Sequence, residues 1–177
     1  LGDGAETFAA AWKMPALNAD TIAFLQYTSG STGDPKGVMV GHGNLMQNCS
    51  VIQPAMDWNR DTSILTALPL FHDMGLVGGV LESMFIGCVA NCMPPAEFVQ
   101  YPERWLQLIS KFGITISGGP NFMYDLASRV VTDEQIAGCD LSGWRVAFCG
   151  AEPIRASTIR RFTDRFAAFG FRPESFF

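Results

Sequence analysis

A short segment rich in glycine and hydroxyl side chains is the part of the sequence best suited to binding a chain of phosphates. It reads Tyr-Thr-Ser-Gly-Ser-Thr-Gly-Asp-Pro-Lys-Gly from Tyr27 to Gly37. Its glycines let the backbone turn sharply and bring amide groups close to an anion, its hydroxyls add donors, and Lys36 adds a positive charge. The alternative is a flexible surface turn, which uses the same residue types. Pro35 stands five residues after Gly30, so the spacing disfavours a Walker A loop.

Two further segments place polar residues directly after predicted strands. In the first, His72 stands beside Asp73, as a general base would stand beside an orienting carboxylate. Adjacent side chains are expected not to face each other, so a histidine satisfied at a helix start is the other interpretation. The second runs from Phe148 to Pro153 and leads from a strand into a helix that starts with proline. By itself it is an ordinary α/β turn.

Strand-like and helix-like segments alternate along the chain and must position these residues. Strands are predicted at residues 21–27, 38–40, 63–68, 88–93, 114–116 and 144–148. Helices are predicted at residues 42–56, 74–85, 102–112, 121–131 and 154–169. Residues 1–20 are predicted to be an irregular lead-in to one domain over residues 21–177. The alternation predicts an α/β fold with a layered, largely parallel sheet flanked by helices, and ligands beyond the carboxyl ends of its strands.

The composition excludes several classes of function. The net charge of -5 and the pI near 4.9 argue against a nucleic-acid partner. Glycines and polar residues interrupt the most apolar stretch, residues 74–90, so no membrane span is predicted. No signal peptide is recognisable. The five cysteines are odd in number and have no histidine near their one close pair, so we interpret them as reduced thiols of a cytoplasmic protein and predict no metal site.

The segment from Tyr27 to Gly37 resembles the phosphate loop of the adenylate-forming superfamily, which contains acyl-CoA synthetases, luciferases and adenylation domains. The resemblance implies that the β- and γ-phosphates of ATP are held between Thr28 and Lys36. It also implies that the segment beginning at Gly150 lies against adenine, and that Phe71 and His72 position the acyl carboxylate. The nucleotide-binding residues implied in this way are Thr28, Ser29, Gly30, Ser31, Thr32, Gly33, Lys36, Gly150, Ala151, Glu152 and Pro153.

Within that superfamily the sequence is most similar to fatty acyl-AMP ligases. The similarity rests on three segments: residues 117–122, the His-Asp-Met-Gly run with its later double glycine, and residues 170–172. Phe122, Met123 and Met84 are candidate walls of an acyl tunnel, with ordinary core packing as the alternative. Four arginines on the last helix could meet an acidic carrier protein. The alternative is a solvated face in which Arg160 and Arg161 lie near Asp164.

The resemblance implies ATP-dependent activation of a fatty acid to its acyl-adenylate, with release of pyrophosphate. Mg²⁺ would assist, and the partner would be an acyl carrier protein or a polyketide or nonribosomal peptide synthase. Two alternatives stay open: a fatty acyl-CoA synthetase and a catalytically silent nucleotide-binding module. The chain begins with Leu1 and ends at Phe177, before the family's Tyr-Gly-x-x-Glu segment with its Mg²⁺ ligand and before its C-terminal domain. We therefore expect a partial N-terminal domain that is inactive alone.

Overall fold

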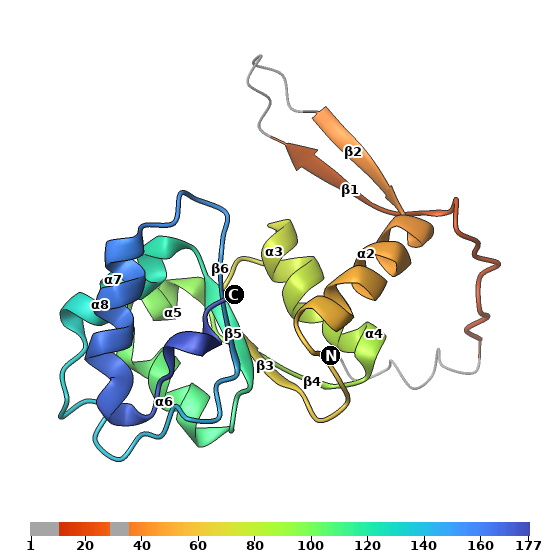
Figure 1. Cartoon of the computed structure of the whole chain (residues 1–177). Helices are drawn as coiled ribbons and strands as arrows, with labels where there is room; N and C mark the ends of the chain where they lie inside the picture. Colours follow the sequence, from red (N-terminus) through yellow and green to blue (C-terminus); the bar gives the residue numbers. More distant parts are fainter. Residues whose placement is uncertain (1–10, 29–35) are drawn as a thin grey trace. The chain divides into compact units, whose positions relative to one another are not determined.

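The computed structural model describes residues 11–28 and 36–177, and the chain folds as two compact units. The first unit contains the residues up to Gln47, and the second runs from Asn48 to Phe177. The boundary falls inside helix α2 (His42–Ala55), which is predicted correctly from its periodicity. The elements of both units are labelled in Figure 1.

The first unit is built around an antiparallel hairpin. Its strands are β1 (Ile22–Thr28) and β2 (Lys36–Gly41), and the register pairs Thr28 with Lys36 at the end of the ladder. Residues 11–20, which lead into β1, contain neither helix nor strand. The two residues that flank the predicted phosphate loop are therefore cross-strand neighbours, while the loop from Ser29 to Pro35 lies outside the described residues.

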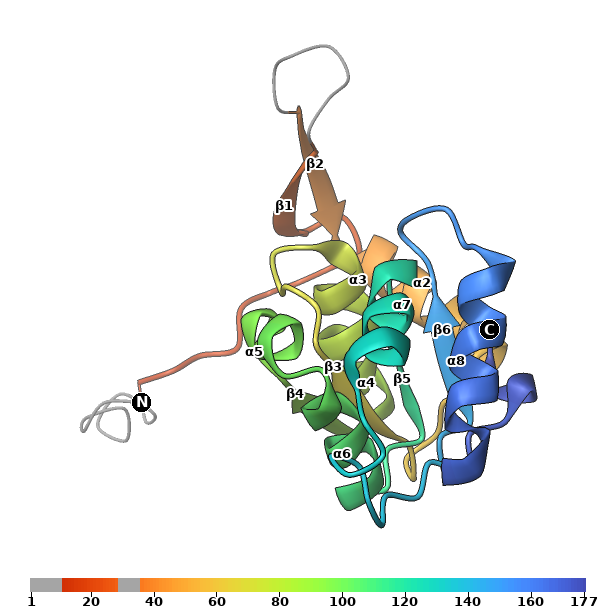
Figure 2. The same ribbon diagram turned by 90° about the vertical axis from the view of Figure 1, so that its left-hand side faces the viewer.

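The second unit contains a sheet of four parallel strands in the order β4-β3-β5-β6. These strands are β3 (Ser63–Thr66), β4 (Val89–Cys92), β5 (Ile116–Gly119) and β6 (Val146–Cys149). One face is covered by α5 (Pro95–Gln100), α6 (Glu103–Lys111), α7 (Asn121–Val130) and α8 (Ala156–Phe166). Short 3₁₀ turns follow at Ala167–Phe169 and Pro173–Ser175. The other face carries one composite helix made of α3 (Asp73–Gly75), the π-helical segment η1 (Leu76–Leu81) and α4 (Glu82–Ile86), as Figures 1 and 2 show.

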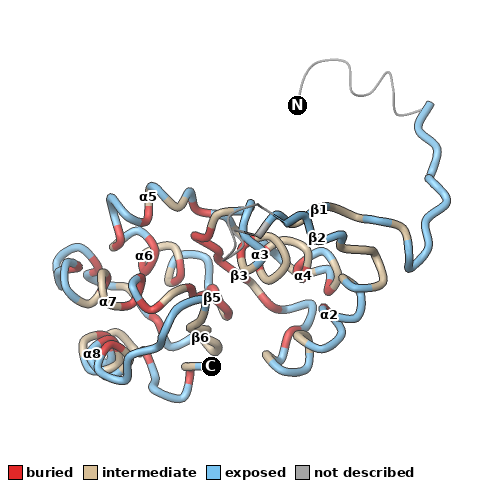
Figure 3. The backbone as a smooth tube through the Cα atoms, turned by 90° about the horizontal axis from the view of Figure 1, so that it is seen from above, coloured by how far each residue is buried: buried red, intermediate tan, exposed pale blue. Residues whose placement is uncertain are grey.

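Both faces of this sheet are buried, as expected for parallel strands. Along β3, Ile64 packs into a small cluster on the α4 face, and its neighbour Leu65 packs into a larger cluster under α5 to α8. The larger cluster is dominated by aromatic rings: the Trp105 and Trp144 ring centroids are 5.1 Å apart. Figure 3 shows the buried backbone concentrated along the strands and the inner sides of these helices. The large cluster is the main hydrophobic core.

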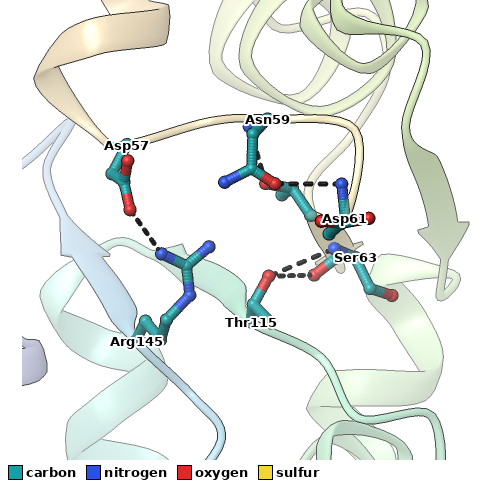
Figure 4. Close-up of polar contacts among 7 residues, drawn as sticks. Asp57, Asn59, Asp61, Ser63, Thr115 and Arg145 are labelled. Carbon is teal, nitrogen blue, oxygen red and sulfur yellow. Dashed lines mark hydrogen bonds and ion pairs between the residues drawn. The ribbon is translucent and has the colours of Figure 1, made fainter.

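Polar contacts tie the strands together at their amino ends (Figure 4). The Thr115 hydroxyl contacts both the Ser63 amide nitrogen, at 3.1 Å, and the Ser63 carbonyl oxygen, at 3.2 Å. Arg145, just before β6, pairs with Asp57 at 2.6 Å in the turn that follows α2. These contacts fix the strand starts relative to one another, at the end of the sheet opposite the predicted ligand loops.

Most predicted elements are confirmed, and two predictions need correction. The strand predicted at residues 114–116 lies later, at Ile116–Gly119, because glycines that are poor strand formers are accepted where two backbones must approach closely. Helix α5 is absent from the predicted elements, because Pro94 and Pro95 directly follow the strand predicted at residues 88–93 and prolines end strands. Pro95 is in fact the first residue of this helix, where its lack of an amide hydrogen costs no helical bond.

The close approach of β5 to β6 depends on Gly118. A Cβ atom there would lie 2.1 Å from the Phe148 carbonyl oxygen and 2.8 Å from the Phe148 nitrogen. Both are backbone atoms of the neighbouring strand, so they cannot move aside as the end of a side chain can. No residue larger than glycine fits at this position without separating the two strands.

We therefore expect Gly118→Ala to lower the free energy of unfolding by at least about 3 kcal/mol, the upper end of overpacking costs. Urea denaturation followed by tryptophan fluorescence measures this. Gly78→Ala is the matched control, because a Cβ at Gly78 meets nothing within 4 Å. The control should raise the free energy of unfolding by less than about 1 kcal/mol, because alanine is more stable than glycine inside a helix. Equal effects of the two substitutions would contradict the close approach of β5 and β6 at Gly118.

Candidate functional site

Three loops meet beyond the carboxyl ends of β3, β5 and β6. Two glycines lie against residues that follow β3: a Cβ on Gly119 would lie 3.1 Å from Leu68 Cδ2, and one on Gly150 would lie 3.3 Å from Met74 Cε. The residues after β3 therefore lie against the ends of β5 and β6. This edge is where parallel α/β sheets bind their ligands. The structure thus brings the His72 segment and the Gly150 segment together.

The segment after β3 presents Phe71 and His72 at the start of the composite helix. Phe71 is 84% exposed. His72 is the N-cap of α3, and its Nδ1 atom accepts the Met74 amide hydrogen at 3.2 Å. Helix formation here is assisted by Gly75, whose missing side chain leaves room for the Pro69 carbonyl oxygen, 2.4 Å from where a Cβ would stand. The helix start therefore fixes the position of the imidazole.

The expectation that His72 and Asp73 do not face each other is wrong. His72 Nδ1 lies 2.7 Å from Asp73 Oδ1, because both side chains turn toward the Met74 amide. Asp73 Oδ1 also accepts the Met74 amide hydrogen at 2.8 Å. When Nδ1 carries a proton it donates to Asp73, and Met74 retains Asp73 as its acceptor. In both arrangements the contacts use Nδ1, so Nε2 is the imidazole atom presented for a ligand.

The segment after β6 contains a residue in a conformation unusual for a side chain with a Cβ atom. Ala151 has φ +66°, in the left-handed region. Such residues cost about 1–3 kcal/mol each and concentrate at functional sites. The next residue, Glu152, accepts the Phe122 amide hydrogen at 2.6 Å and so caps α7 from another loop. No sequence pattern predicts this cap, since 30 residues separate the two partners.

Asn121 is a further site residue that sequence reasoning did not identify. Its side chain is 7% exposed, and its Oδ1 atom accepts the Arg155 amide hydrogen at 3.0 Å. Asn121, the first residue of α7, is thus bonded to Arg155, the residue before α8. An asparagine that follows a proline at a helix start was the available signal.

The other predicted site residues have different outcomes. Ser29, Gly30, Ser31, Thr32 and Gly33 lie outside the described residues, while Thr28 and Lys36 are the paired ends of the hairpin. Met123 is a core residue, whereas Phe122 and Met84 are exposed. On α8, Arg161 pairs with Asp125 of α7, and Arg165 pairs with Asp133 in the segment after α7. Two of the four arginines therefore make ion pairs within the chain.

The described residues contain five free cysteines and no group of three or more His, Cys, Asp or Glu side chains that could hold a metal. No helix in the described part of the chain is long and apolar enough to cross a membrane.

Comparison with known proteins gives the family. A profile of the AMP-binding enzyme family matches residues 3–171. The chain belongs to the AMP-binding enzyme family. This AMP-binding chain is 47% identical over 163 residues to the medium-chain-fatty-acid acyl-carrier-protein ligase TtuA of Teredinibacter turnerae. It is 46% identical over 166 residues to the ligase of the same description, JamA, of Moorena producens.

A solved structure gives the same result for the fold. The fatty acyl-adenylate ligase from L. pneumophila, in complex with acyl adenylate and pyrophosphate, superposes on the AMP-binding chain with a TM-score of 0.90 at 46% identity. That match covers 94% of this chain and 30% of the other. The chain likewise spans 25% of TtuA and 28% of JamA. The shared fold is the part of an adenylate-forming enzyme built on a parallel sheet.

The helix that follows His72 carries a buried acid. Glu82 is 0% exposed, and neither of its carboxylate oxygens has a hydrogen-bond partner among the described residues. Burial raises the pKa of Glu82, and the neighbouring Cys49 thiol offsets only part of that rise. Burial, together with Glu82, raises the pKa of Cys49 to about 12. Folding therefore makes both groups hold their protons more tightly.

We expect Glu82→Gln to stabilise the AMP-binding chain increasingly as the pH rises. A carboxyl group whose pKa is raised by folding holds its proton more tightly in the folded state. Its contribution is therefore present below the ordinary pKa near 4.5 and lost as the pH rises through the folded pKa. Urea denaturation between pH 4 and pH 8 measures the difference.

Glu174→Gln, at an exposed glutamate, is the control and should follow the unmodified protein at every pH. If the stability difference between Glu82→Gln and the unmodified protein is the same at all pH values, folding does not raise the pKa of Glu82.

Proposed function

We propose that the full-length protein activates a fatty acid as its acyl-adenylate, with release of pyrophosphate, and passes the acyl group to the phosphopantetheine thiol of an acyl carrier protein. The observation that carries this proposal is the family match together with 46–47% identity to two carrier-protein ligases. The geometry after β3 and β6 supports it, because it places an exposed histidine and a glycine-containing backbone segment at one sheet edge. A synthase that contains a carrier domain would be the corresponding partner.

In the proposed reaction, one oxygen of the fatty-acid carboxylate attacks the α-phosphorus of ATP. The bond from that phosphorus to the bridging oxygen breaks, and pyrophosphate leaves. We assign the β- and γ-phosphates to the loop between Thr28 and Lys36, where the lysine neutralises charge that builds up on the leaving group. We assign the acyl carboxylate to His72 Nε2 and Phe71, and the adenine ring to the backbone of Gly150 and Ala151.

Mg²⁺ would add charge neutralisation at the phosphates when bound. The described residues contain no cluster of carboxylates or histidines suited to it, so we assign the metal no ligand from them. The loop hydroxyls and Lys36 can still act on the phosphates directly. A cytoplasmic location follows from the proposal, because ATP and carrier proteins are its substrates.

The proposal predicts fatty-acid-dependent release of pyrophosphate from ATP by the full-length protein. With a phosphopantetheinylated carrier protein present, the acyl group should move to the carrier, which intact-protein mass spectrometry detects. Coenzyme A in place of the carrier should accept little or no acyl group. Efficient transfer to coenzyme A would instead make the protein an acyl-CoA synthetase, and an absence of pyrophosphate release would remove the adenylation proposal.

Replacing Lys36 with alanine in the full-length protein should weaken ATP binding by about 1.5–3 kcal/mol, the range for a hydrogen bond to a charged group. That range corresponds to a rise in the KM for ATP of about 10- to 150-fold. Lys111→Ala is the matched control, because this lysine is the last residue of α6 and its ammonium lies 5.2 Å from the Phe112 ring centroid. An unchanged KM for ATP in Lys36→Ala would remove this lysine from the phosphate site.

A further inference from the structure

The loop between β6 and α8 is fastened to the end of β5 and the start of α7 by hydrogen bonds in both directions. The Gly150 amide donates to the Gly119 carbonyl oxygen at 3.4 Å. Glu152 Oε1 accepts the Phe122 amide hydrogen at 2.6 Å. Residues after β5 therefore hold the loop near its beginning and its middle.

The end of the loop next to α8 is held by a side chain of α7. Asn121 Oδ1 accepts the Arg155 amide hydrogen at 3.0 Å, and Asn121 is buried. We call the Glu152–Phe122 and Asn121–Arg155 hydrogen bonds together the loop latch. One bond uses a side chain of the loop and the other a side chain of α7, so neither segment can shift without breaking a bond.

The strained residue lies between these attachments. Ala151 follows Gly150 and precedes Glu152, and its φ of +66° is one that alanine leaves when its surroundings allow. A loop held at a single point could relax to negative φ. Because the residues on both sides of Ala151 are bonded to Gly119 and Phe122, the loop keeps this conformation.

The Glu152 carboxylate lies at the start of α7, where it accepts the Phe122 amide hydrogen. Pro120, the N-cap of α7, makes no side-chain capping bond, so the Phe122 amide depends on Glu152 for its partner. The positive end of the helix dipole favours a negative charge at the same place. The carboxylate thus has an intramolecular partner that suits its charge, which leaves the backbone of Gly150 and Ala151 as the part of the loop that can meet a flat ring.

We propose that Glu152 is a positioning residue for the nucleotide, acting through Ala151, and that it is not itself a nucleotide ligand. Asn121 has the same role from the opposite side. The proposal rests on the adenylation function proposed above. In the Gly150 to Pro153 segment, the backbone then forms the nucleotide contact, and Glu152 holds that backbone in its conformation.

The test compares Glu152→Ala with Glu152→Gln in the full-length protein by steady-state pyrophosphate release. Glutamine retains an oxygen that can accept the Phe122 hydrogen, so its KM for ATP should stay within about threefold of the unmodified protein, while alanine loses the bond and should raise that KM about tenfold. The KM for the fatty acid should change less than twofold in both. If glutamine raises the KM for ATP as much as alanine, Glu152 contacts the nucleotide directly and the proposal is overturned.

A second substitution tests the role of Ala151. Glycine adopts positive φ without strain, so adding Ala151→Gly to Glu152→Ala should recover about half of the lost ATP affinity on a logarithmic scale. An absence of recovery in the double variant would show that the latch does not act through Ala151.

Hydrogen exchange followed by mass spectrometry separates this proposal from the adenylation proposal. The Phe122 amide should exchange faster in Glu152→Ala than in Glu152→Gln, whether or not the protein makes acyl-adenylate. Glu174→Ala, an exposed glutamate elsewhere, is the control and should leave both kinetics and exchange unchanged. Faster exchange without pyrophosphate release from the unmodified protein would overturn the function and leave the latch as a structural device. Unchanged exchange at Phe122 would overturn the latch.

Discussion

The contact between β5 and the aromatic core is the constraint on which the second unit depends. Ser117 lies at its centre: the hydroxyl donates to the Leu65 carbonyl oxygen at 2.7 Å and accepts the Trp105 indole hydrogen at 2.9 Å. The Ser117 carbonyl oxygen accepts the Trp144 indole hydrogen at 3.1 Å. A buried serine with all of these bonds joins strand β3, helix α6 and Trp144 in the segment that leads into β6. Removing one partner would leave another polar group buried and unpaired, which costs more than the bond itself contributes.

Close packing along β5 continues into the candidate site. Gly118 allows β6 to lie close beside β5, Gly119 allows Leu68 and Met123 to close over the strand end, and Gly150 faces Met74. Tyr124 then fixes the end of β6 from α7, because its hydroxyl donates to the Phe148 carbonyl oxygen at 2.8 Å. The site edge is therefore an extension of the core packing, and loops that leave these strands inherit well-defined starting points.

The sequence predicted the class of fold well, because alternation of strand and helix patterns survives burial on both faces of the sheet. It predicted less where a residue's role is set by partners distant along the chain. The position of β5 was missed because Ser117, Gly118 and Gly119 are poor strand formers individually and are placed there by Trp105 and Phe148. Of the candidate site, the segments near His72 and Gly150 were found from motif resemblance, whereas Asn121 and the capping role of Glu152 depend on contacts across about 30 residues.

The aromatic core also has a consequence for how the two units can be observed. Of the four tryptophans, Trp58, Trp105 and Trp144 are buried in the second unit, and Trp12 is 67% exposed in the first. Acrylamide therefore reaches the Trp12 indole while the three buried indoles are shielded from it. Emission from the shielded indoles reports on the second unit, and the quenchable fraction reports on the first. The native chain thus carries a separate optical signal for each unit, without any added label.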